Sequence, residues 1–477
     1  MALVLGIDSS TQSTKVEVRD ADSGELVAHG RAPHPATTPP RSEQDPRAWW
    51  DALGEAIAGA GDAARDVAAV SVAGQQHGMV VLDVDDHVIR PAKLWNDTES
   101  APDAQWLIDR LARIEGRDGA AAWADACGSV PVAAFTITKL SWLHRSEPEA
   151  WARVARVGLP HDWLIWKLTG AFVTDRGDAS GTGYFSAARD EYNLDLLAVV
   201  DGDADWATRL PRVLKPTERA GTTSAFGLDA IVVPGTGDNM AAAIALALRP
   251  GQVAISLGTS GTVYTVSESA TADPTGAVAG FADATGRFLP LVCTLNATKV
   301  TDTMGRWLGV DPAHLAALAL DAAPGADGVV VVPYFDGERT PNRPDASGAI
   351  AGLRTDTTAG QLARAAVEGV VCGLLDGLDA LTRAGVRADG DIVLIGGGAR
   401  SPAYQRVVAD LSGRTVVVPY EAEHVAAGAC AQAAAVLRDR DVAEVAAEWS
   451  LGRGVTIEPD ANVDRERVRA AYAAARG

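Results

Sequence analysis

The sequence predicts an α/β fold built from two domains, and three observations lead to that prediction. Short apolar stretches that end in polar turns alternate with helical patterns along the chain, which is typical of mixed sheets with helices on both faces. The opening pattern, an apolar strand, a polar turn and an alternating strand, recurs after residue 250. The length of 477 residues corresponds to about two or three domains. Because clefts between such domains are common ligand sites, an inter-domain cleft is expected.

The first domain opens with a predicted β-hairpin. Residues 3–7 form an apolar run, residues 8–14 (DSSTQST) form a polar turn, and residues 15–20 (KVEVRD) alternate in polarity. Residues 26–33 extend the hairpin as a third strand. A helix capped by Asp45 follows, with a proline at its first position.

The rest of this domain contains further predicted strands and helices. Residues 67–74 (VAAVSVAG) predict a buried strand, and residues 139–151 and 160–170 show a helical periodicity rich in tryptophan. Residues 230–239 (AIVVPGTGDN) predict a strand that runs into a glycine-rich turn, followed by an apolar helix. The first domain is therefore expected to span residues 1–248.

The pattern restarts near residue 250. Residues 252–268 predict a strand, a polar turn (GTSGT) and an alternating strand. Residues 390–411 predict a strand that leads through three glycines into a helix, with Ser401 as its N-cap. A second domain is therefore expected over residues 249–440, followed by a helical tail with a loop over residues 441–477.

The chain is strongly acidic, with 42 Lys and Arg against 62 Asp and Glu and a formal net charge of −20. Such a surface repels nucleic acid and anionic membranes, so neither is an expected partner. The N-terminal stretch lacks the features of a signal peptide, and no uncharged apolar run reaches ~18 residues. The four cysteines are far apart and lack C-x-x-C spacing, which makes a zinc site unexpected. A cytoplasmic location is expected.

Two of the predicted turns are rich in groups that bind phosphate. One spans Asp8–Lys15 and the other spans Gly258–Thr262. Such turns direct backbone N–H groups and hydroxyls to one place, which suits phosphate oxygens. Most polar hairpin turns have no such role, but recurrence in both domains favours it. The sequence contains no Walker G-x-x-x-x-G-K-[ST] loop and no dinucleotide G-x-G-x-x-G fingerprint.

Residues near these turns each have two interpretations. Asp8 either accepts hydrogen bonds from the turn or holds Mg²⁺, through water, beside phosphate. Lys15 is either a phosphate-binding cation or a solvated edge residue. The three glycines Gly396–Gly398 form either a strand-to-helix corner or a place where the backbone passes close to a flat ligand.

Two motifs of the first domain contain candidate catalytic and ligand-binding groups. Asp238 precedes an apolar helix and is a candidate N-cap, and its carboxylate also suits the general base of a phosphoryl transfer. Gln75, Gln76 and His77 follow a predicted strand, where they offer donors and acceptors to a polyhydroxyl ligand. Taken alone, a histidine such as His77 is more often a loop residue with satisfied hydrogen bonds.

Ordered motifs along residues 3–440 together resemble the FGGY carbohydrate kinases, most of all the members that phosphorylate D-xylulose. These motifs are GIDSSTQSTK, SEQDPRAWW, AGQQHG, RPAKLWND, FTITKLSWL, GTGDN, SLGTSGT, GERTP, GAIAGLRTDTTAGQLARAAVEG and LIGGGARSPAY. The resemblance implies two domains of the actin-like, ribonuclease H-like ATPase fold, the first binding sugar and the second binding nucleotide. ATP and Mg²⁺ are the implied cofactors, and a homodimer is expected from the resemblance alone.

The resemblance also implies roles for individual residues. Asp238 matches the general base, and Asp8 matches the catalytic carboxylate beside Mg²⁺. The implied sugar-binding residues are Gln76, His77, Asp238 and Asn239. The implied ATP-binding residues lie in three loops: Thr11, Gln12, Ser13 and Lys15; Gly258, Thr259 and Ser260; and Gly396, Gly397, Gly398 and Ala399.

The chain departs from the family pattern at several positions. Ser10 replaces a frequent Gly, Gln76 replaces a frequent Met, and Thr236 lies in a motif that is usually GGGDN. Glu99 replaces a frequent Arg, and Ala134 replaces the usual first residue of the N-terminal family signature. None of these changes alters the general base, whereas Gln76 and Glu99 bear on the identity of the sugar.

The expected reaction is the ATP-dependent phosphorylation of D-xylulose to D-xylulose 5-phosphate. Within the family, another ketose or polyol (L-xylulose, ribulose or glycerol) is the alternative substrate. From another class, an actin-like or Hsp70-like ATPase without a sugar substrate is the alternative, and the Gln-His and Gly-Asp-Asn motifs argue against it.

Overall fold

The computed structural model describes residues 2–421 and 423–477, which form two compact units. Unit 1 comprises the chain up to Ala247 together with Glu268–Leu289 and Glu423–Leu451. Unit 2 comprises the segment that begins at Leu248 and ends at Ser267, the chain from Pro290 to residue 421, and the C-terminal residues from Gly452. The chain first passes from unit 1 to unit 2 between Ala247 and Leu248. It returns to unit 1 twice, at Glu268 and at Glu423.

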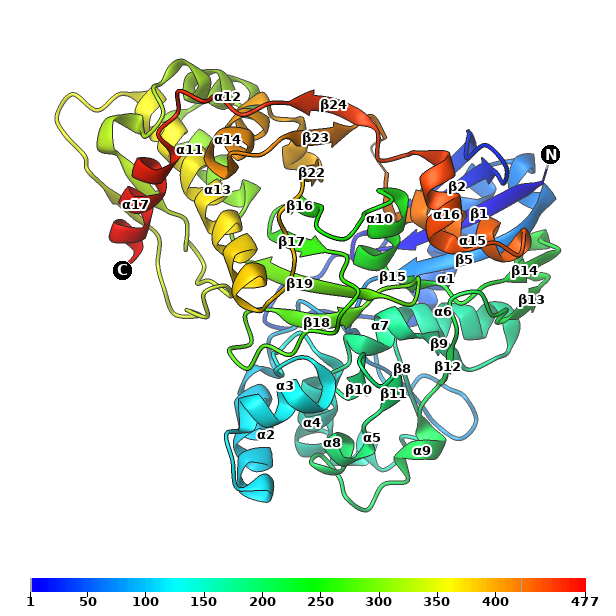
Figure 1. Cartoon of the computed structure of the whole chain (residues 1–477). Helices are drawn as coiled ribbons and strands as arrows, with labels where there is room; N and C mark the ends of the chain where they lie inside the picture. The colour runs from blue at the N-terminus through cyan, green and yellow to red at the C-terminus, as the bar shows by residue number, and fades with distance from the viewer. Residues whose placement is uncertain (1, 422) are drawn as a thin grey trace. The chain divides into compact units, whose positions relative to one another are not determined.

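A mixed sheet forms the centre of unit 1 (Figure 1). The hairpin strands and the third strand are antiparallel, while two further strands run parallel to the first. In spatial order the sheet contains β13 (Gly221–Thr223), β14 (Ala230–Val232), β5 (Val67–Gly74), β1 (Leu3–Ser9), β2 (Ser13–Asp20) and β3 (Leu26–Pro33). The predicted hairpin, its third strand and the buried strand at 67–74 are confirmed.

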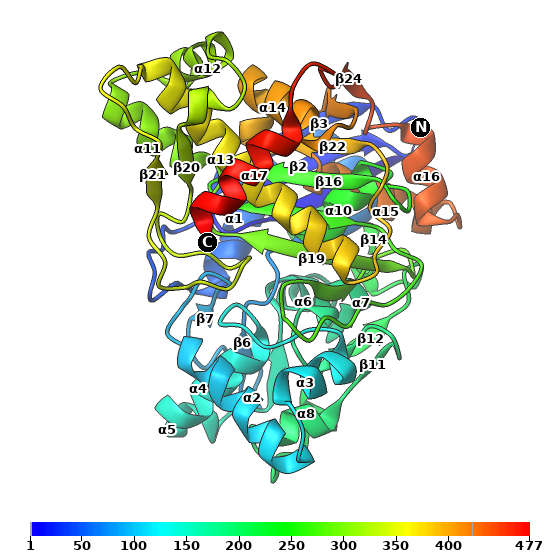
Figure 2. The same cartoon turned by 60° about the vertical axis from the view of Figure 1, so that its left-hand side comes forward.

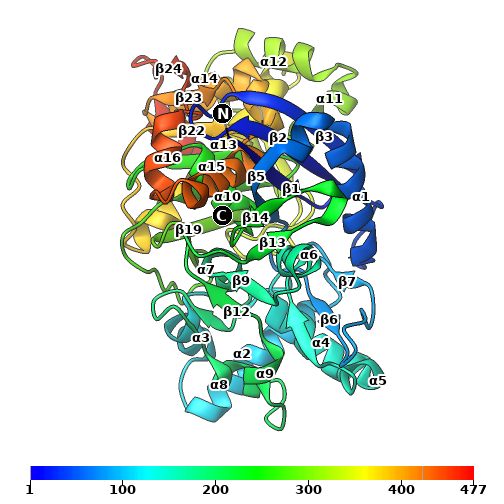
Figure 3. The same cartoon turned by 90° about the vertical axis from the view of Figure 1, so that its right-hand side faces the viewer.

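Helices cover both faces of this sheet. α15 (Val425–Leu437) lies against β1 and β5, and α1 (Pro46–Gly59) lies against β2 and β3 (Figure 3). A Cβ atom on Gly6 would lie 2.0 Å from the carbonyl oxygen of Ala426 in α15, so only glycine permits this close approach. The predicted cap of α1 is confirmed, because the Asp45 side chain accepts a hydrogen bond from the backbone N–H of Arg47.

The remaining elements of unit 1 are short strands and helices between and around the sheet strands. The strands are β4 (Glu43–Gln44), β6 (Val80–Leu82), β7 (Ala92–Lys93), β8 (Arg156–Gly158), β9 (Val173–Asp175), β10 (Phe185–Ser186), β11 (Glu191–Tyr192), β12 (Arg212–Leu214), β15 (Thr236–Gly237) and β18 (Ala279–Ala282). The helices are α2 (Ala101–Glu115), α3 (Gly119–Cys127), α4 (Thr136–Ser146), α5 (Pro148–Trp151), α6 (Pro160–Thr169), α7 (Arg176–Ser180), α8 (Leu194–Ala198), α9 (Trp206–Arg209), α10 (Asp238–Ala245) and α16 (Val442–Trp449).

The structure divides the helix expected over residues 139–151. α4 ends at Ser146 and α5 begins at Pro148, with Glu147 in a non-helical conformation between them. The cause is Pro148, since a proline disfavours the helical conformation in the residue before it.

The sheet of unit 2 repeats the arrangement of unit 1. An antiparallel hairpin is followed in space by two strands parallel to its first strand. In spatial order its strands are β19 (Phe288–Thr294), β17 (Gly261–Thr265), β16 (Val253–Leu257), β22 (Ile392–Ile395), β23 (Val416–Pro419) and β24 (Gly454–Ile457). The tail expected as helix and loop thus also contributes a strand, because β24 pairs antiparallel with β23.

Helix α13 (Ala359–Arg383) packs against the unit 2 sheet, and α17 (Arg465–Arg476) contacts α13 (Figure 2). The other elements of unit 2 are β20 (Val330–Val332), β21 (Ala349–Ala351), α11 (Thr298–Leu308), α12 (Pro312–Asp321) and α14 (Pro402–Ser412). Ser401 is the N-cap of α14, as predicted, and Pro402 occupies the first turn. Across residues 2–421 and 423–477, no helix is both long and apolar enough to cross a membrane.

Candidate active site

Three parallel strands of unit 1 end at the same edge of the sheet. β1 pairs with β5, and β5 pairs with β15, so that Ser9, Gly74 and Gly237 lie in register. Asp8 is the penultimate residue of β1, and Asp238 directly follows β15. Since the carboxyl ends of parallel strands meet at one edge, the structure places both predicted acids at this edge.

Asp8 is a buried carboxylate with one free oxygen. Its side chain is 3% exposed, and its Oδ2 lies 3.4 Å from the Nζ of Lys15. Its Oδ1 has no hydrogen-bond partner among the described residues. Burial raises the pKa of Asp8 to about 6, although Lys15 acts in the opposite direction. A buried carboxylate oxygen without a partner fits a hydrated Mg²⁺ ion, which takes oxygen ligands.

Asp238 is the first residue of α10. Its Oδ1 accepts hydrogen bonds from the backbone N–H of Asn239 at 2.7 Å and from Asn239 Nδ2 at 2.9 Å. Burial raises the pKa of Asp238 to about 7, and the negative charge of Asp8 adds to the shift. A carboxylate with a pKa near neutrality is suited to accept a hydroxyl proton at physiological pH.

The interpretation of Asp238 as a helix N-cap is wrong. Gly237 occupies the N-cap position of α10, and no side-chain capping hydrogen bond forms there. The Asp238 carboxylate instead accepts hydrogen bonds from the neighbouring Asn239. It therefore lies among the polar side chains at this edge of the sheet.

Asn239 connects Asp238 to Gln76. Its Nδ2 also donates to Oε1 of Gln76 at 2.9 Å. Gln76 is 4% exposed, and its Nε2 has no hydrogen-bond partner among the described residues. A Cβ atom on Gly237 would lie 2.7 Å from Gln76 Cγ, so the glycine makes room for this amide. The structure thus brings Gln76, Asp238 and Asn239 together and leaves an amide donor that suits a hydroxyl ligand.

His77 is held in a defined orientation next to these residues in the chain. Its Nδ1 lies 2.7 Å from the carbonyl oxygen of Gly181, and its ring packs against Phe135 and Phe281. A carbonyl oxygen only accepts hydrogen bonds, so Nδ1 bears the proton. Its contact with the sugar stays a prediction.

The first predicted phosphate turn is ordered by hydrogen bonds within the turn and by two side chains from other segments. The backbone N–H and the hydroxyl of Ser10 both donate to the carbonyl oxygen of Ser13, each at 3.1 Å. The Thr11 hydroxyl donates to Gln75 Oε1 at 3.1 Å and accepts from Trp95 Nε1 at 2.9 Å. The Thr11 hydroxyl thus has two partners within unit 1, and its contact with phosphate stays a prediction.

Lys15 bridges two acids from distant parts of the sequence. Its Nζ lies 2.7 Å from Glu423 Oε2 as well as 3.4 Å from Asp8. Burial opposes the charge of Lys15, yet Asp8 and Glu423 outweigh it and raise the pKa of Lys15. Lys15 is therefore a cation. Gln12, in the turn between β1 and β2, is exposed to solvent.

In unit 2, the second phosphate turn joins β16 to β17 and meets the start of α11. The backbone N–H of Gly258 donates to the carbonyl oxygen of Ser260 at 3.0 Å. The N–H groups of Ala297 and Thr298 donate to the carbonyl oxygens of Thr259 and Gly258. The turn is thereby fixed against the N-terminus of a helix, a position where anions are stabilised.

The three glycines after β22 differ in their surroundings. A Cβ atom on Gly396 would lie 2.7 Å from the Leu257 carbonyl oxygen, and one on Gly398 would lie 2.8 Å from Leu257 Cβ and Thr298 Cγ2. A Cβ atom on Gly397 would meet nothing within 4 Å. Gly396 and Gly398 therefore form a tight corner beside the phosphate turn, whereas Gly397 is open to a ligand. Ala399, the next residue, is buried and accepts a hydrogen bond from Gln405.

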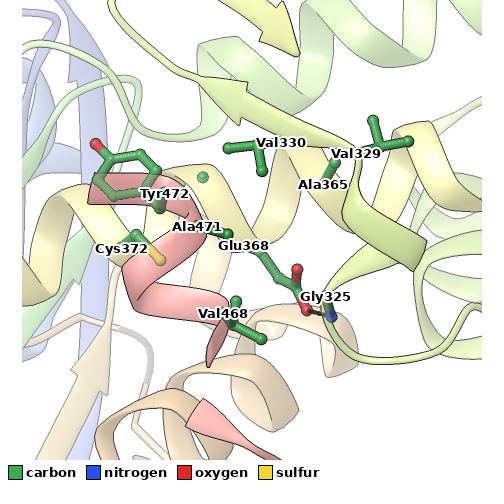
Figure 4. A pocket seen from close by; sticks show the side chains of 10 residues that line it. Gly325, Val329, Val330, Ala365, Glu368, Cys372, Val468, Ala471 and Tyr472 are labelled. Carbon is green, nitrogen blue, oxygen red and sulfur yellow. Dashed lines mark hydrogen bonds between the residues drawn. The ribbon is translucent and has the colours of Figure 1, made fainter. Parts of the chain in front are cut away.

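A small cavity in unit 2 is lined by none of the predicted site residues (Figure 4). Its volume is about 20 Å³, room for about one water molecule. Glu368 and Tyr472 line it, and Glu368 accepts a hydrogen bond from the N–H of Gly325. It is too small for a sugar or a nucleotide.

Two residues that contact the site, Trp95 and Glu423, are absent from the sequence predictions, and Gln75, predicted to face a polyhydroxyl ligand, contacts the first turn. Gln75 and Trp95 hold the Thr11 hydroxyl, and Glu423 holds Lys15. Trp95 lies in the RPAKLWND motif, which could have drawn attention to it. No local signal marks Glu423, because it is 408 residues away from Lys15.

The shared strand order of the two sheets is that of the ribonuclease H-like fold of the actin-like ATPases, as the family resemblance implied. A family model described as "FGGY family of carbohydrate kinases, N-terminal domain" matches residues 3–245, and the corresponding C-terminal domain model matches residues 253–437. The chain belongs to the FGGY family of carbohydrate kinases.

Curated and solved relatives agree with this assignment. The chain is 50% identical to a xylulose kinase of Streptomyces coelicolor over 96% of this chain and 92% of that protein. It is 34% identical to a xylulose kinase of Haemophilus influenzae over 90% of each chain. The crystal structure of xylulose kinase from Bifidobacterium adolescentis covers 100% of this chain and 99% of its own, with 43% identity and a TM-score of 0.89.

Proposed function

We propose that this protein transfers the γ-phosphoryl group of ATP to the terminal hydroxyl of D-xylulose, forming D-xylulose 5-phosphate and ADP. The observation that carries the proposal is the unit 1 edge, where Asn239 links the carboxylate of Asp238 to the amide of Gln76. A general base and a sugar-binding amide are thereby held side by side. The curated relatives named xylulose kinase, one of them 50% identical, indicate the sugar.

In the proposed reaction the O5 hydroxyl of the sugar attacks the γ-phosphorus. A new O–P bond forms, the bond to the ADP oxygen breaks, and the hydroxyl proton moves to Asp238. The pKa of Asp238, about 7, leaves a large ionised fraction at neutral pH and still makes the carboxylate basic enough to take the proton. Phosphoryl transfer needs little more than this base, correct positioning and charge neutralisation.

Asp8 is the residue that would hold Mg²⁺, through water, with its free Oδ1. The bound ion would neutralise charge on the phosphates of ATP. Lys15 supplies a second positive charge beside Asp8.

The loops of unit 2 are the proposed contacts for ATP. We assign the phosphates to Gly258, Thr259 and Ser260, and the adenosine to Gly396–Ala399. The open space beside Gly397 supports this assignment, because a flat group can approach the backbone there. A cytoplasmic location and a homodimer stay predictions.

A sugar panel tests the proposal. Purified protein is supplied with ATP and D-xylulose, L-xylulose, D-ribulose or glycerol, with and without Mg²⁺, and ADP release is measured. D-xylulose with Mg²⁺ is expected to give the highest kcat/KM. A higher kcat/KM for another sugar would move the assignment to that sugar, and equal ADP release without any sugar would indicate an ATPase instead.

A further inference from the structure

A buried cluster of charged residues lies next to the turn that carries Asp238. Its centre is His161, the second residue of α6, which is 0% exposed. Its ring nitrogen Nε2 lies 2.7 Å from the carbonyl oxygen of Pro234. Its other ring nitrogen, Nδ1, lies 3.0 Å from Asp162 Oδ1 and 3.4 Å from Asp178 Oδ2.

The partners of His161 determine its charge. The Pro234 carbonyl oxygen can only accept, so Nε2 must bear a proton. Nδ1 lies within ion-pair distance of two carboxylate oxygens, although it is not aligned for a hydrogen bond with either. The negative charge beside it repels a nitrogen lone pair and favours an N–H group. Both nitrogens therefore bear protons, and the ring is an imidazolium. Burial disfavours this charge, yet the two aspartates outweigh it and raise the pKa of His161 well above its ordinary value.

The ring also fits tightly into the backbone of the edge. A Cβ atom on Gly74, the last residue of β5, would lie 2.7 Å from His161 Cβ. Gly235 has a φ of +70°, and a Cβ atom there would lie 2.7 Å from the His161 ring and 2.3 Å from the Val72 carbonyl oxygen. His161 thus occupies the space between β5 and the turn that leads into β15.

The same cluster holds the turn at a second point. Asp175 Oδ2 accepts a hydrogen bond from the Thr236 hydroxyl at 2.9 Å, and Asp175 also caps α7 through the N–H groups of Gly177 and Asp178. α7 contacts β15, and α6 contacts β5 (Figure 1). Three residues further along from Asp178, the Gly181 carbonyl oxygen holds His77.

We infer that His161 is a positioning residue whose buried imidazolium, paired with Asp162 and Asp178, fixes the Pro234–Gly237 turn and thereby aims Asp238 at the sugar hydroxyl. The inference rests on the proposed function. The ionisable groups around the ring are Asp162 on α6 itself, Asp175 and Asp178 on or beside α7, and the hydroxyls of Tyr184 and Tyr192.

Two substitutions test the role in catalysis. His161→Gln keeps a donor for Pro234 but removes the charge, and Asp178→Asn keeps the shape of a partner but weakens the ion pair. His161→Gln is expected to lower kcat at least ~10-fold, because a small displacement of a reacting group is costly. Binding of ATP, measured by titration calorimetry, is expected to stay within about twofold, since misplacing Asp238 leaves the nucleotide contacts intact. His314→Gln, on the exposed surface of α12, is the matched control and is expected to keep the wild-type rate.

The pH profile separates positioning from mere structural support. In the wild type the raised pKa of His161 keeps the imidazolium protonated further into the alkaline range than in an ordinary histidine, so kcat is expected to hold on the alkaline side. In Asp178→Asn the proton is held less tightly, so kcat is expected to fall on the alkaline side. Superimposable profiles for Asp178→Asn and the wild type would overturn the inference.

A spectroscopic measurement tests the charge without any activity. Protein carrying ¹⁵N-histidine is examined by long-range ¹H–¹⁵N correlation at pH 8, with His161→Gln assigning the signal. Two protonated ring nitrogens are expected for His161, and a neutral ring would refute the inference. If the wild type phosphorylates no sugar, the proposed function fails instead. If it does so and His161→Gln retains its kcat, the inference alone fails.

Discussion

The two sheet edges of this molecule share a scaffold and differ in chemistry. In each unit an antiparallel hairpin is followed by parallel strands, and the candidate residues lie where strands end. The edge of unit 1 carries carboxylates and amides, with Asp8, Gln76 and Asp238 on three neighbouring segments. The edge of unit 2 carries glycines and hydroxyls, with Gly258–Ser260 beside Gly396–Gly398.

This difference assigns different physical tasks to the two edges. Carboxylates whose pKa values are raised by loss of solvent contact can take up a proton or hold a metal ion. Backbone N–H groups and an unobstructed glycine bind an anion or a flat ring without any charge of their own. Substitutions at the first edge should therefore change the chemical step, and those at the second should change nucleotide binding.

The largest effect is expected from Asp238→Ala. Loss of the general base should lower kcat at least ~10²-fold, while ATP affinity, measured by calorimetry, stays close to the wild type. The matched control is Asp229→Asn, an exposed acid of the same unit, which should keep the wild-type rate. Turnover near the wild-type value in Asp238→Ala would remove Asp238 from the mechanism.

The pH dependence should report the same carboxylate. Asp238 accepts a proton only when ionised, and its pKa is about 7. Below that pH the protonated fraction grows, so kcat/KM for D-xylulose should fall about tenfold per pH unit. The measurement is a kcat/KM profile from pH 5 to 9, a range taken as roughly two units either side of that pKa. A profile flat down to about pH 5 would contradict the raised pKa.

Asp8→Asn should give the next largest effect, a weaker binding of Mg²⁺. The loss of a group that holds the metal through water typically costs about 10–100-fold in metal affinity or activity. We expect the Mg²⁺ concentration for half-maximal rate to rise by roughly tenfold. The assay is a Mg²⁺ titration at saturating ATP and sugar. An unchanged Mg²⁺ requirement would leave Asp8 without a role at the metal.

The smallest effect is expected at the second edge, where two neighbouring glycines form a matched pair. Gly397→Val places its side chain in open space, so the melting temperature should hold while the KM for ATP rises roughly tenfold. Gly398→Ala meets Leu257 and Thr298 instead, so it should lower the melting temperature. Equal ATP KM values in Gly397→Val and the wild type would break the proposed contrast between the edges.

Much of the fold was predictable from local sequence patterns, because individual strands, turns and helix caps are determined mainly by residues that are neighbours in the sequence. The hairpin at residues 3–20, the strand at 67–74 and the cap at Asp45 follow from alternation, apolar runs and capping chemistry. The strand β24 was missed because its pairing partner, β23, lies far away in the sequence. The N-cap interpretation of Asp238 failed because Gly237 takes that position.

The site was predictable in its residues but not in its connections. Motif matching pointed to Gln76, Asp238 and Asn239, whereas the hydrogen bonds that join them arise from strands brought together by folding. The same holds for Glu423, which meets Lys15 across 408 positions. His161 carried no signal beyond a helical pattern, since its charge depends on carboxylates and a carbonyl oxygen from three segments.

Identification of the product tests the central claim most directly. Wild-type protein is incubated with ATP, Mg²⁺ and D-xylulose, and the products are followed by ³¹P NMR together with ADP formation. The account predicts one phosphomonoester on C5 of xylulose for each ADP formed, and no inorganic phosphate. Release of inorganic phosphate at the same rate whether or not the sugar is present would contradict it.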